Sequence, residues 1–135
     1  MTVLGSCLCG GVRFAVAGPL RPVVACHCVQ CRKTSGHYVA ATSALRDDIR
    51  FAADASLRWF RASTTARRGF CGTCGSSLFW APDTGPRMSI HAGALDGATG
   101  LALIGHIFCA DKGDYYTLCD DLPQASQNDP ELGTQ

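Results

Sequence analysis

The sequence predicts a mainly β domain, and three observations support this. Short apolar or alternating runs recur along the chain, glycine-rich turns separate them, and a long amphipathic helix pattern is missing. Several short strands at close spacing, with turn residues between them, are typical of an all-β domain. The chain has 135 residues, the usual size of one domain.

The expected strands follow one another as far as residue 108. The first, residues 12–16, alternates apolar with polar or small residues and ends at the turn signal Gly18-Pro19. The other expected strands cover residues 23–25, 38–42, 49–51, 57–61, 68–70, 77–80, 88–91 and 103–108. Short helical pieces are expected after Cys28, through Arg32-Lys33, and near residues 44–47. We expect residues 1–125 to form the domain and residues 126–135 to form a polar, frayed tail.

Composition excludes several classes of function. With 47% hydrophobic and 17% charged residues the chain is globular, and its net charge of +1 offers no basic surface for a nucleic acid. No apolar run approaches the roughly 18 residues that a membrane span needs. Residues 1–10 carry no secretory signal pattern. We therefore expect a cytoplasmic protein with no nucleic-acid or membrane partner.

The cysteine content indicates metal binding. The chain has nine cysteines, an odd number that complete disulfide pairing would not use up. In a reducing compartment, a chain this rich in cysteine more often binds metal than forms disulfides.

Three cysteines close together in the sequence predict one metal site. Residues i and i+2 of a strand point to the same side, so Cys26 and Cys28 converge while His27 points away. Cys31 lies three residues further on, and a tight turn returns it to the same ion. Three thiolates leave the fourth position of a zinc ion open to water or substrate, which is typical of a catalytic site.

Two cysteine pairs, distant in sequence, predict a second site. Cys7 and Cys9 have i, i+2 spacing, and Cys71 and Cys74 have C-x-x-C spacing in the turn of an expected hairpin. Four cysteines form the closed tetrahedron of structural zinc, here joining the N-terminal hairpin to the central one. The sequence thus predicts two zinc ions per chain, one structural and one catalytic.

Two other arrangements of these cysteines remain open. In one, Cys28 and Cys31 join Cys71 and Cys74 around a single zinc ion, and the other clustered cysteines stay free. In the other, His37 closes the three-cysteine site, so that both sites are structural.

The remaining histidines and cysteines are expected to be structural. His91 and His106 lie on apolar strands and are expected to be packed and hydrogen-bonded. Cys109 and Cys119 stand outside the clusters and are expected to be small buried hydrophobes.

At the cysteine motifs the sequence resembles the glutathione-dependent formaldehyde-activating enzyme and centromere protein V family. The matching segments occur in order: residues 5–12, residues 26–33 with Ser35-Gly36, residues 70–76, His106-Ile107-Phe108 and Asp111-Lys112. The resemblance implies an Mss4-like fold, in which small antiparallel sheets pack like a tent. It implies the same division of ligands: Cys7, Cys9, Cys71 and Cys74 for structural zinc, and Cys26, Cys28 and Cys31 for catalytic zinc.

Two functions are therefore considered. The first, which the resemblance implies, is a zinc-dependent carbon–sulfur lyase or synthase that joins a thiol such as glutathione to a small aldehyde such as formaldehyde. The second is a zinc-stabilised protein-binding module without catalysis.

Substrate contacts are less clear in the sequence. The pairs Arg32-Lys33 and Arg67-Arg68 flank the cysteine motifs and could meet carboxylates of the thiol, but we expect surface charges. The aspartates at 47–48 and 120–121 are expected in turns. The sequence assigns neither a general base nor an oligomeric state.

Overall fold

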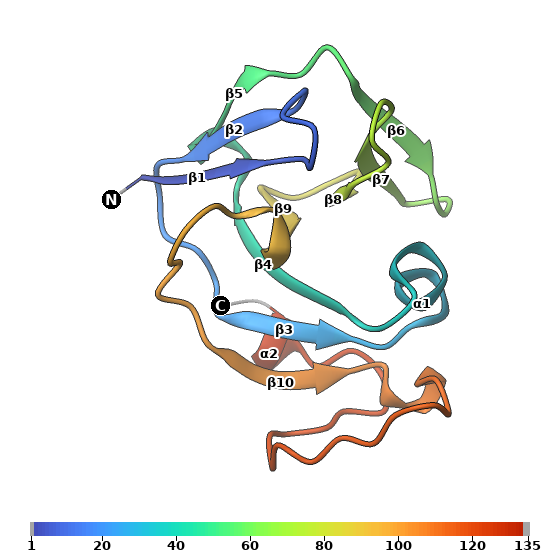
Figure 1. Ribbon diagram of the computed structural model, residues 1–135. Coiled ribbons are helices and arrows are strands. Elements are labelled where there is room, and N and C mark those ends of the chain that lie inside the picture. The colour runs from blue at the N-terminus through green and yellow to red at the C-terminus, as the bar shows by residue number, and fades with distance from the viewer. Residues whose placement is uncertain (1, 134–135) are drawn as a thin grey trace.

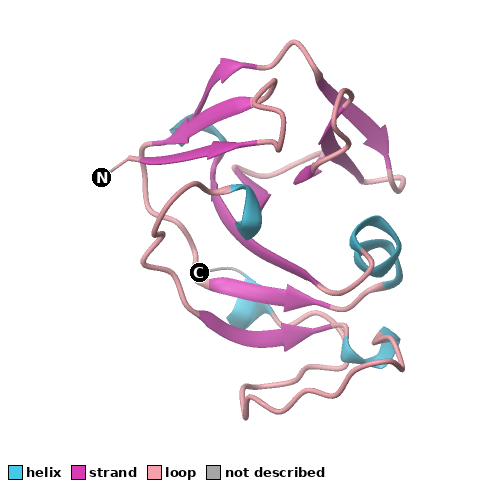
Figure 2. Cartoon of the chain, viewed as in Figure 1, coloured by secondary structure: helices cyan, strands magenta, loops and turns pink. Residues whose placement is uncertain are grey.

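The structure, a computed structural model, describes residues 2–133, which form two β-sheets with short helices around them (Figures 1 and 2). The mainly β prediction is confirmed, and the arrangement is consistent with an Mss4-like fold. Each expected strand is present, with bounds that differ by a few residues. No helix within residues 2–133 is long and apolar enough to cross a membrane.

The smaller sheet has the strand order β1-β2-β5. The strands are β1 (Val3–Ser6), β2 (Arg13–Val16) and β5 (Ile49–Ala53), and both pairings are antiparallel. In β2, Phe14 and Val16 are buried while Arg13 is exposed, as expected for a strand with one face on the core. The sequence did not predict β1, because its buried residue is Gly5 and its apolar Leu4 is exposed, so that apolar and polar residues do not alternate.

The larger sheet has the strand order β10-β3-β4-β9-β8-β7-β6. Its strands are β3 (Val23–Cys26), β4 (Val39–Leu45), β6 (Leu57–Arg61), β7 (Ala66–Cys71), β8 (Ser77–Pro82), β9 (Arg87–His91) and β10 (Leu103–Ile107). All neighbours are antiparallel except β10 and β3, which run parallel. This one parallel pair makes the larger sheet mixed, which the expectation of antiparallel sheets did not include, because a strand's sequence pattern does not encode the direction of its partner.

The helices are short. Helix α1 (Val29–Ser35) begins after its N-cap Cys28 and ends at Gly36, whose φ of 83° suits glycine. It is the helical piece expected after Cys28. The piece expected near residues 44–47 is reduced to the 3-10 turn η1 (Arg46–Asp48), because β4 continues to Leu45. Two further 3-10 turns are η2 (Ala92–Ala94) and η3 (Cys109–Asp111).

The apolar core joins the two sheets. Phe79 of β8 is fully buried, and its ring lies 5.1 Å from that of Phe14 and 5.7 Å from that of Phe51, both in the smaller sheet. Val16 from the smaller sheet and Ile90 from the larger one belong to the same buried cluster. Burial of these side chains provides the main driving force for holding the sheets together.

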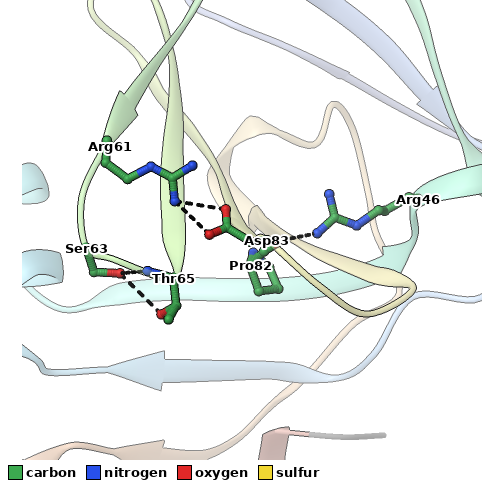
Figure 3. Close-up of polar contacts among 6 residues, drawn as sticks. All are labelled: Arg46, Arg61, Ser63, Thr65, Pro82 and Asp83. Carbon is green, nitrogen blue, oxygen red and sulfur yellow. Dashed lines mark hydrogen bonds and ion pairs between the residues drawn. The ribbon is translucent and has the colours of Figure 1, made fainter.

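Polar contacts connect the end of β8 and the loop after it to β6 and η1 (Figure 3). Arg61 of β6 donates to both carboxylate oxygens of Asp83, at 2.8 and 2.9 Å, and Arg46 of η1 donates to the main-chain oxygen of Pro82. The ion pair is exposed, so its contribution to stability is at most about 1 kcal/mol.

The C-terminal segment packs against the larger sheet. The main-chain N–H of Phe108 donates to Gln127, and helix α2 (Pro130–Gly133) places buried Leu132 against Gly105. The expectation of a frayed tail is therefore wrong for residues 126–133, because Leu132 is an apolar anchor. Residues 134–135 lie outside the described part of the chain. The domain boundary at residue 125 stays a prediction.

Candidate metal centres

One cysteine group joins the two sheets. Cys7 and Cys9 lie in the turn between β1 and β2, while Cys71 ends β7 and Cys74 lies in the turn before β8. The four sulfur atoms lie within 4.8 Å of one another. The tight return of the chain after Cys74 uses Gly75, whose φ is 79°.

The sulfur separations of this group suit a tetrahedral ion. The Sγ atoms of Cys7 and Cys9 are 3.6 Å apart, and those of Cys9 and Cys71 are 3.8 Å apart. A tetrahedral zinc with Zn–S bonds of about 2.3 Å places its sulfurs about 3.8 Å apart. These two separations therefore fit a tetrahedral zinc ion.

The surroundings of Cys71 and Cys74 favour their thiolate forms. A hydrogen bond with the Ser56 hydroxyl lowers the pKa of the Cys71 thiol to about 7, and contact with the Ser76 hydroxyl lowers that of Cys74 to about 5. Main-chain N–H groups of Thr73 and Cys74 also point at the Cys71 sulfur, at 3.4 and 3.5 Å. Donors around a sulfur stabilise its anionic form, which is the form that binds metal.

The second group consists of Cys26, Cys28 and Cys31, called here the tripod. Cys26 ends β3, Cys28 is the N-cap of α1, and Cys31 lies in the first turn of that helix. Their sulfurs lie within 4.8 Å of one another, and the N–H of Cys31 donates to the Cys28 sulfur at 3.3 Å. The bend that returns Cys31 to its partners is thus the start of a helix.

The tripod favours one negative charge, which lies on Cys28. Contact with Cys26, then with Cys31, lowers the pKa of the Cys28 thiol to about 2, and the nearby Arg68 charge lowers it further. The contact with Cys28 raises the pKa of the Cys26 thiol. A group that shares its protons in this way gains stability when a cation replaces them.

The structure separates the two groups and disfavours both other arrangements. Cys28 and Cys31 lie in a different group from Cys71 and Cys74, so a single site with these four residues is wrong. His37 does not join the tripod, and its ring packs against Tyr38 and Tyr116, with centroids 4.3 Å away in each case. Within residues 2–133, the tripod offers three ligand atoms and no fourth.

His27 points away from the tripod, as the i, i+2 spacing predicted. Its ring is fully buried and hydrogen-bonds through Nε2 to Nδ1 of His106 at 2.9 Å, while His106 Nε2 donates to Asp120 at 2.7 Å. The phenol of Tyr116 lies 2.5 Å from His27 Nδ1. Because a carboxylate only accepts, each histidine donates from Nε2 and accepts at Nδ1. These hydrogen bonds hold His27, and with it the segment between the end of β3 and the start of α1, in place.

A cavity of about 620 Å³ adjoins the tripod. One face of the larger sheet forms part of its wall, where Arg68, Trp80 and Ser89 are cross-strand neighbours on β7, β8 and β9. All three tripod cysteines line it. Ligand pockets in proteins commonly have about this volume, so the tripod is accessible to a small molecule.

The arginines near the cysteine motifs have different surroundings. Arg68 is only 9% exposed and lines the cavity, so the expectation of a surface charge is wrong for this residue. Arg67 instead stacks on the ring of Trp59, 4.2 Å from its centroid. Lys33 is exposed, and Arg32 is half-buried.

The histidines and cysteines that were expected to be structural also differ in their surroundings. His106 is packed and hydrogen-bonded, as predicted, and its partner Asp120 does more than form a turn. His91 lines the cavity, and its buried Nε2 has no hydrogen-bond partner within residues 2–133. The expectation that Cys109 and Cys119 are buried is wrong, because Cys109 is half-buried and Cys119 exposed. Both follow β10: Cys109 begins the turn η3, and Cys119 lies in the irregular segment after it.

A family model described as glutathione-dependent formaldehyde-activating enzyme matches residues 2–111. The chain belongs to this family. Membership in this family supports glutathione-dependent formaldehyde activation in general. The substrates that the family implies are glutathione and formaldehyde. The match includes both cysteine groups, and Tyr116 and Asp120, which hold His27 and His106, lie beyond it.

A solved structure shows the same fold. The crystal structure of a Rhodobacter sphaeroides protein, a structural genomics target, is similar to this chain with a TM-score of 0.59 and 26% sequence identity. The similarity covers 74% of this chain and 97% of that chain.

Proposed function

We propose that the protein is a zinc-dependent carbon–sulfur lyase or synthase that joins a thiol to a small aldehyde and splits the same adduct. Glutathione and formaldehyde are the substrates proposed from the family. The observation that carries the proposal is the tripod: three cysteine sulfurs at the wall of a cavity of about 620 Å³, with no fourth ligand within residues 2–133.

In this proposal the two cysteine groups have different roles. Cys26, Cys28 and Cys31 would hold the catalytic zinc, and Cys7, Cys9, Cys71 and Cys74 would hold the structural one. Zinc held by these three cysteines would supply a position at which a thiol binds as its thiolate, because the cation would stabilise the anion. The proposal needs reduced cysteines, so we also infer a cytoplasmic location.

The residues of the cavity would then orient the reactants. The substrate thiolate attacks the carbonyl carbon, a carbon–sulfur bond forms, and the carbonyl oxygen takes up a proton. The reverse reaction breaks the same bond. The apolar residues Val24, Val39 and Ile107 line the cavity near the tripod and limit its water content.

A titration of cobalt-substituted protein with glutathione tests this proposal. Cobalt reports its ligands through its visible spectrum, so a thiol that enters the tripod changes the thiolate bands. We expect a saturable change that Cys28→Ser abolishes and Cys119→Ser, at an exposed cysteine outside both groups, leaves intact. Catalysed formation of the formaldehyde adduct should be lost with Cys28→Ser and kept with Cys119→Ser.

The same experiment separates the proposal from a zinc-stabilised protein-binding module. For such a module, glutathione leaves the cobalt spectrum unchanged, and neither variant alters any thiol–aldehyde reaction. That result would remove the enzyme from consideration.

A further inference from the structure

Arg68 is a buried charge at the edge of the tripod. Its Nη2 lies 3.5 Å from the Cys31 sulfur, and its side chain lines the cavity. Within residues 2–133, no carboxylate forms an ion pair with it. A buried guanidinium costs free energy unless an anion balances it, so its charge is balanced by the tripod thiolate and by anionic groups that the cavity receives.

Gln30 orients this guanidinium. Its side-chain oxygen accepts a hydrogen bond from Arg68 Nε at 3.1 Å, and its amide nitrogen donates to the main-chain oxygen of Ala62 at 3.1 Å. Gln30 lies between Cys28 and Cys31, so the tripod loop itself sets the direction of the guanidinium. Nη1 of Arg68 makes no hydrogen bond to residues 2–133 and stays available to a ligand.

A second polar group on the same wall has no partner. His91 lines the cavity, and its Nε2 is buried without a hydrogen bond to any residue in the range 2–133. Buried polar atoms are almost always paired in folded proteins, so an unpaired one beside a cavity indicates a polar ligand. Arg68 and His91 together give the cavity a polar side next to the tripod.

We propose that Arg68 is a catalytic residue that binds the carbonyl oxygen of the aldehyde and stabilises the negative charge that develops there, while Gln30 positions it. The inference rests on the proposed function and adds residues to it. The carbonyl oxygen is two bonds from the substrate sulfur in the adduct. A guanidinium that already contacts a tripod sulfur is therefore within reach of that oxygen.

The step balances without a further reactant. The thiol loses its proton to solvent when it binds as the thiolate. Its sulfur donates an electron pair to the carbonyl carbon, and the π pair of the C=O bond moves to oxygen. Arg68 donates hydrogen bonds to this alkoxide, which then takes a proton from water. The sum is thiol plus aldehyde giving the hydroxyalkyl thioether.

Variants of Arg68 and its neighbour test the proposal. Arg68→Met removes the charge with little change in volume, Arg68→Lys keeps the charge without the planar fork, and Arg67→Met is the matched control on the adjacent residue. NMR exchange between free glutathione and its formaldehyde adduct gives kcat and KM. Glutathione titration of each cobalt-substituted variant measures thiol binding without turnover.

We expect Arg68→Met to lower kcat about 100-fold, as for loss of an oxyanion donor, while glutathione still saturates the cobalt spectrum. Arg68→Lys should recover part of the loss, and Arg67→Met should match the wild type within about twofold. Gln30→Leu, which keeps the charge but removes its orientation, should lower kcat about 10-fold. If Arg68→Met does not fold, the kcat of Gln30→Leu tests whether Arg68 is catalytic.

Two outcomes would overturn the proposal. In the first, the wild type catalyses adduct exchange, and the kcat of Arg68→Met lies within about threefold of the wild-type value. Gln30→Leu serves for this comparison if Arg68→Met does not fold. Arg68 is then not catalytic, although the proposed function stands. If the wild type shows no exchange above the uncatalysed rate, the proposed function fails, and the role of Arg68 fails with it.

Discussion

The two cysteine groups should contribute unequally to stability, because they close chain loops of very different length. Cys9 and Cys71 are 62 residues apart, whereas Cys26 and Cys31 are separated by only five. By the chain-entropy relation for cross-links, the long loop is worth about 4 kcal/mol and the short one about 2 kcal/mol. The group that joins the two sheets should therefore stabilise the fold by about 2 kcal/mol more than the tripod does.

Paired double variants measure this difference. Cys7→Ser with Cys9→Ser releases the N-terminal hairpin from its group, and Cys26→Ser with Cys28→Ser dismantles the tripod. In excess zinc, thermal unfolding followed by circular dichroism should show the first double variant melting about 8 °C below the second. The difference should disappear in EDTA, because the cross-link requires the metal.

Two results would refute the reasoning. Melting temperatures within about 3 °C of each other in zinc would mean that loop length does not set the contribution. A difference that persists unchanged in EDTA would mean that the cysteines act through side-chain packing and not through a bound ion.

Three further predictions concern buried groups. Burial, then the charge of Arg68, lowers the pKa of His91 to about 4. Between pH 6.5 and 4 the imidazole is therefore protonated in the unfolded chain and neutral in the folded one. His91 should therefore make stability fall by about 1.4 kcal/mol per unit as the pH drops from 6.5 towards 4. His27, whose pKa burial also lowers to about 4, adds a slope of its own. Urea unfolding of His91→Gln should show a shallower slope than the wild type, and equal slopes would contradict the assignment. Phe79→Ala should cost about 3–5 kcal/mol in urea unfolding, because the ring is fully buried between the sheets, and a loss below about 1 kcal/mol would mean that the core lies elsewhere. Tyr116→Phe should cost about 1–2 kcal/mol, because Nδ1 of buried His27 loses its donor; an unchanged urea midpoint would show that this bond is not formed in solution.

Much of the fold was predictable because patterns among neighbouring residues in the sequence specify it. Alternation with period two identifies strands, and glycine at a turn identifies where they end, so nine of the ten strands within residues 2–133 were expected. The strand β1 was missed because its four residues do not alternate between apolar and polar types. The fraying expected for residues 126–133 was wrong, because a single apolar residue, Leu132, anchors a polar segment.

The candidate ligands were also recorded locally. Cysteines spaced i, i+2 share a side of the chain, and a C-x-x-C turn brings two sulfurs together, so the seven clustered cysteines could be named as candidate ligands from spacing alone. The sequence by itself thus determined the fold class, the seven clustered cysteines and the family resemblance.

Only the tertiary structure decided how those cysteines divide and what surrounds them. Which pairs meet depends on contacts between residues far apart in the chain, and local patterns do not encode such contacts. The same holds for Arg68 and Arg67, which are adjacent in sequence but lie in opposite surroundings: one is buried at the tripod, and the other is stacked on Trp59. A strand sends alternate side chains to opposite faces, and the fold alone determines which face borders the cavity.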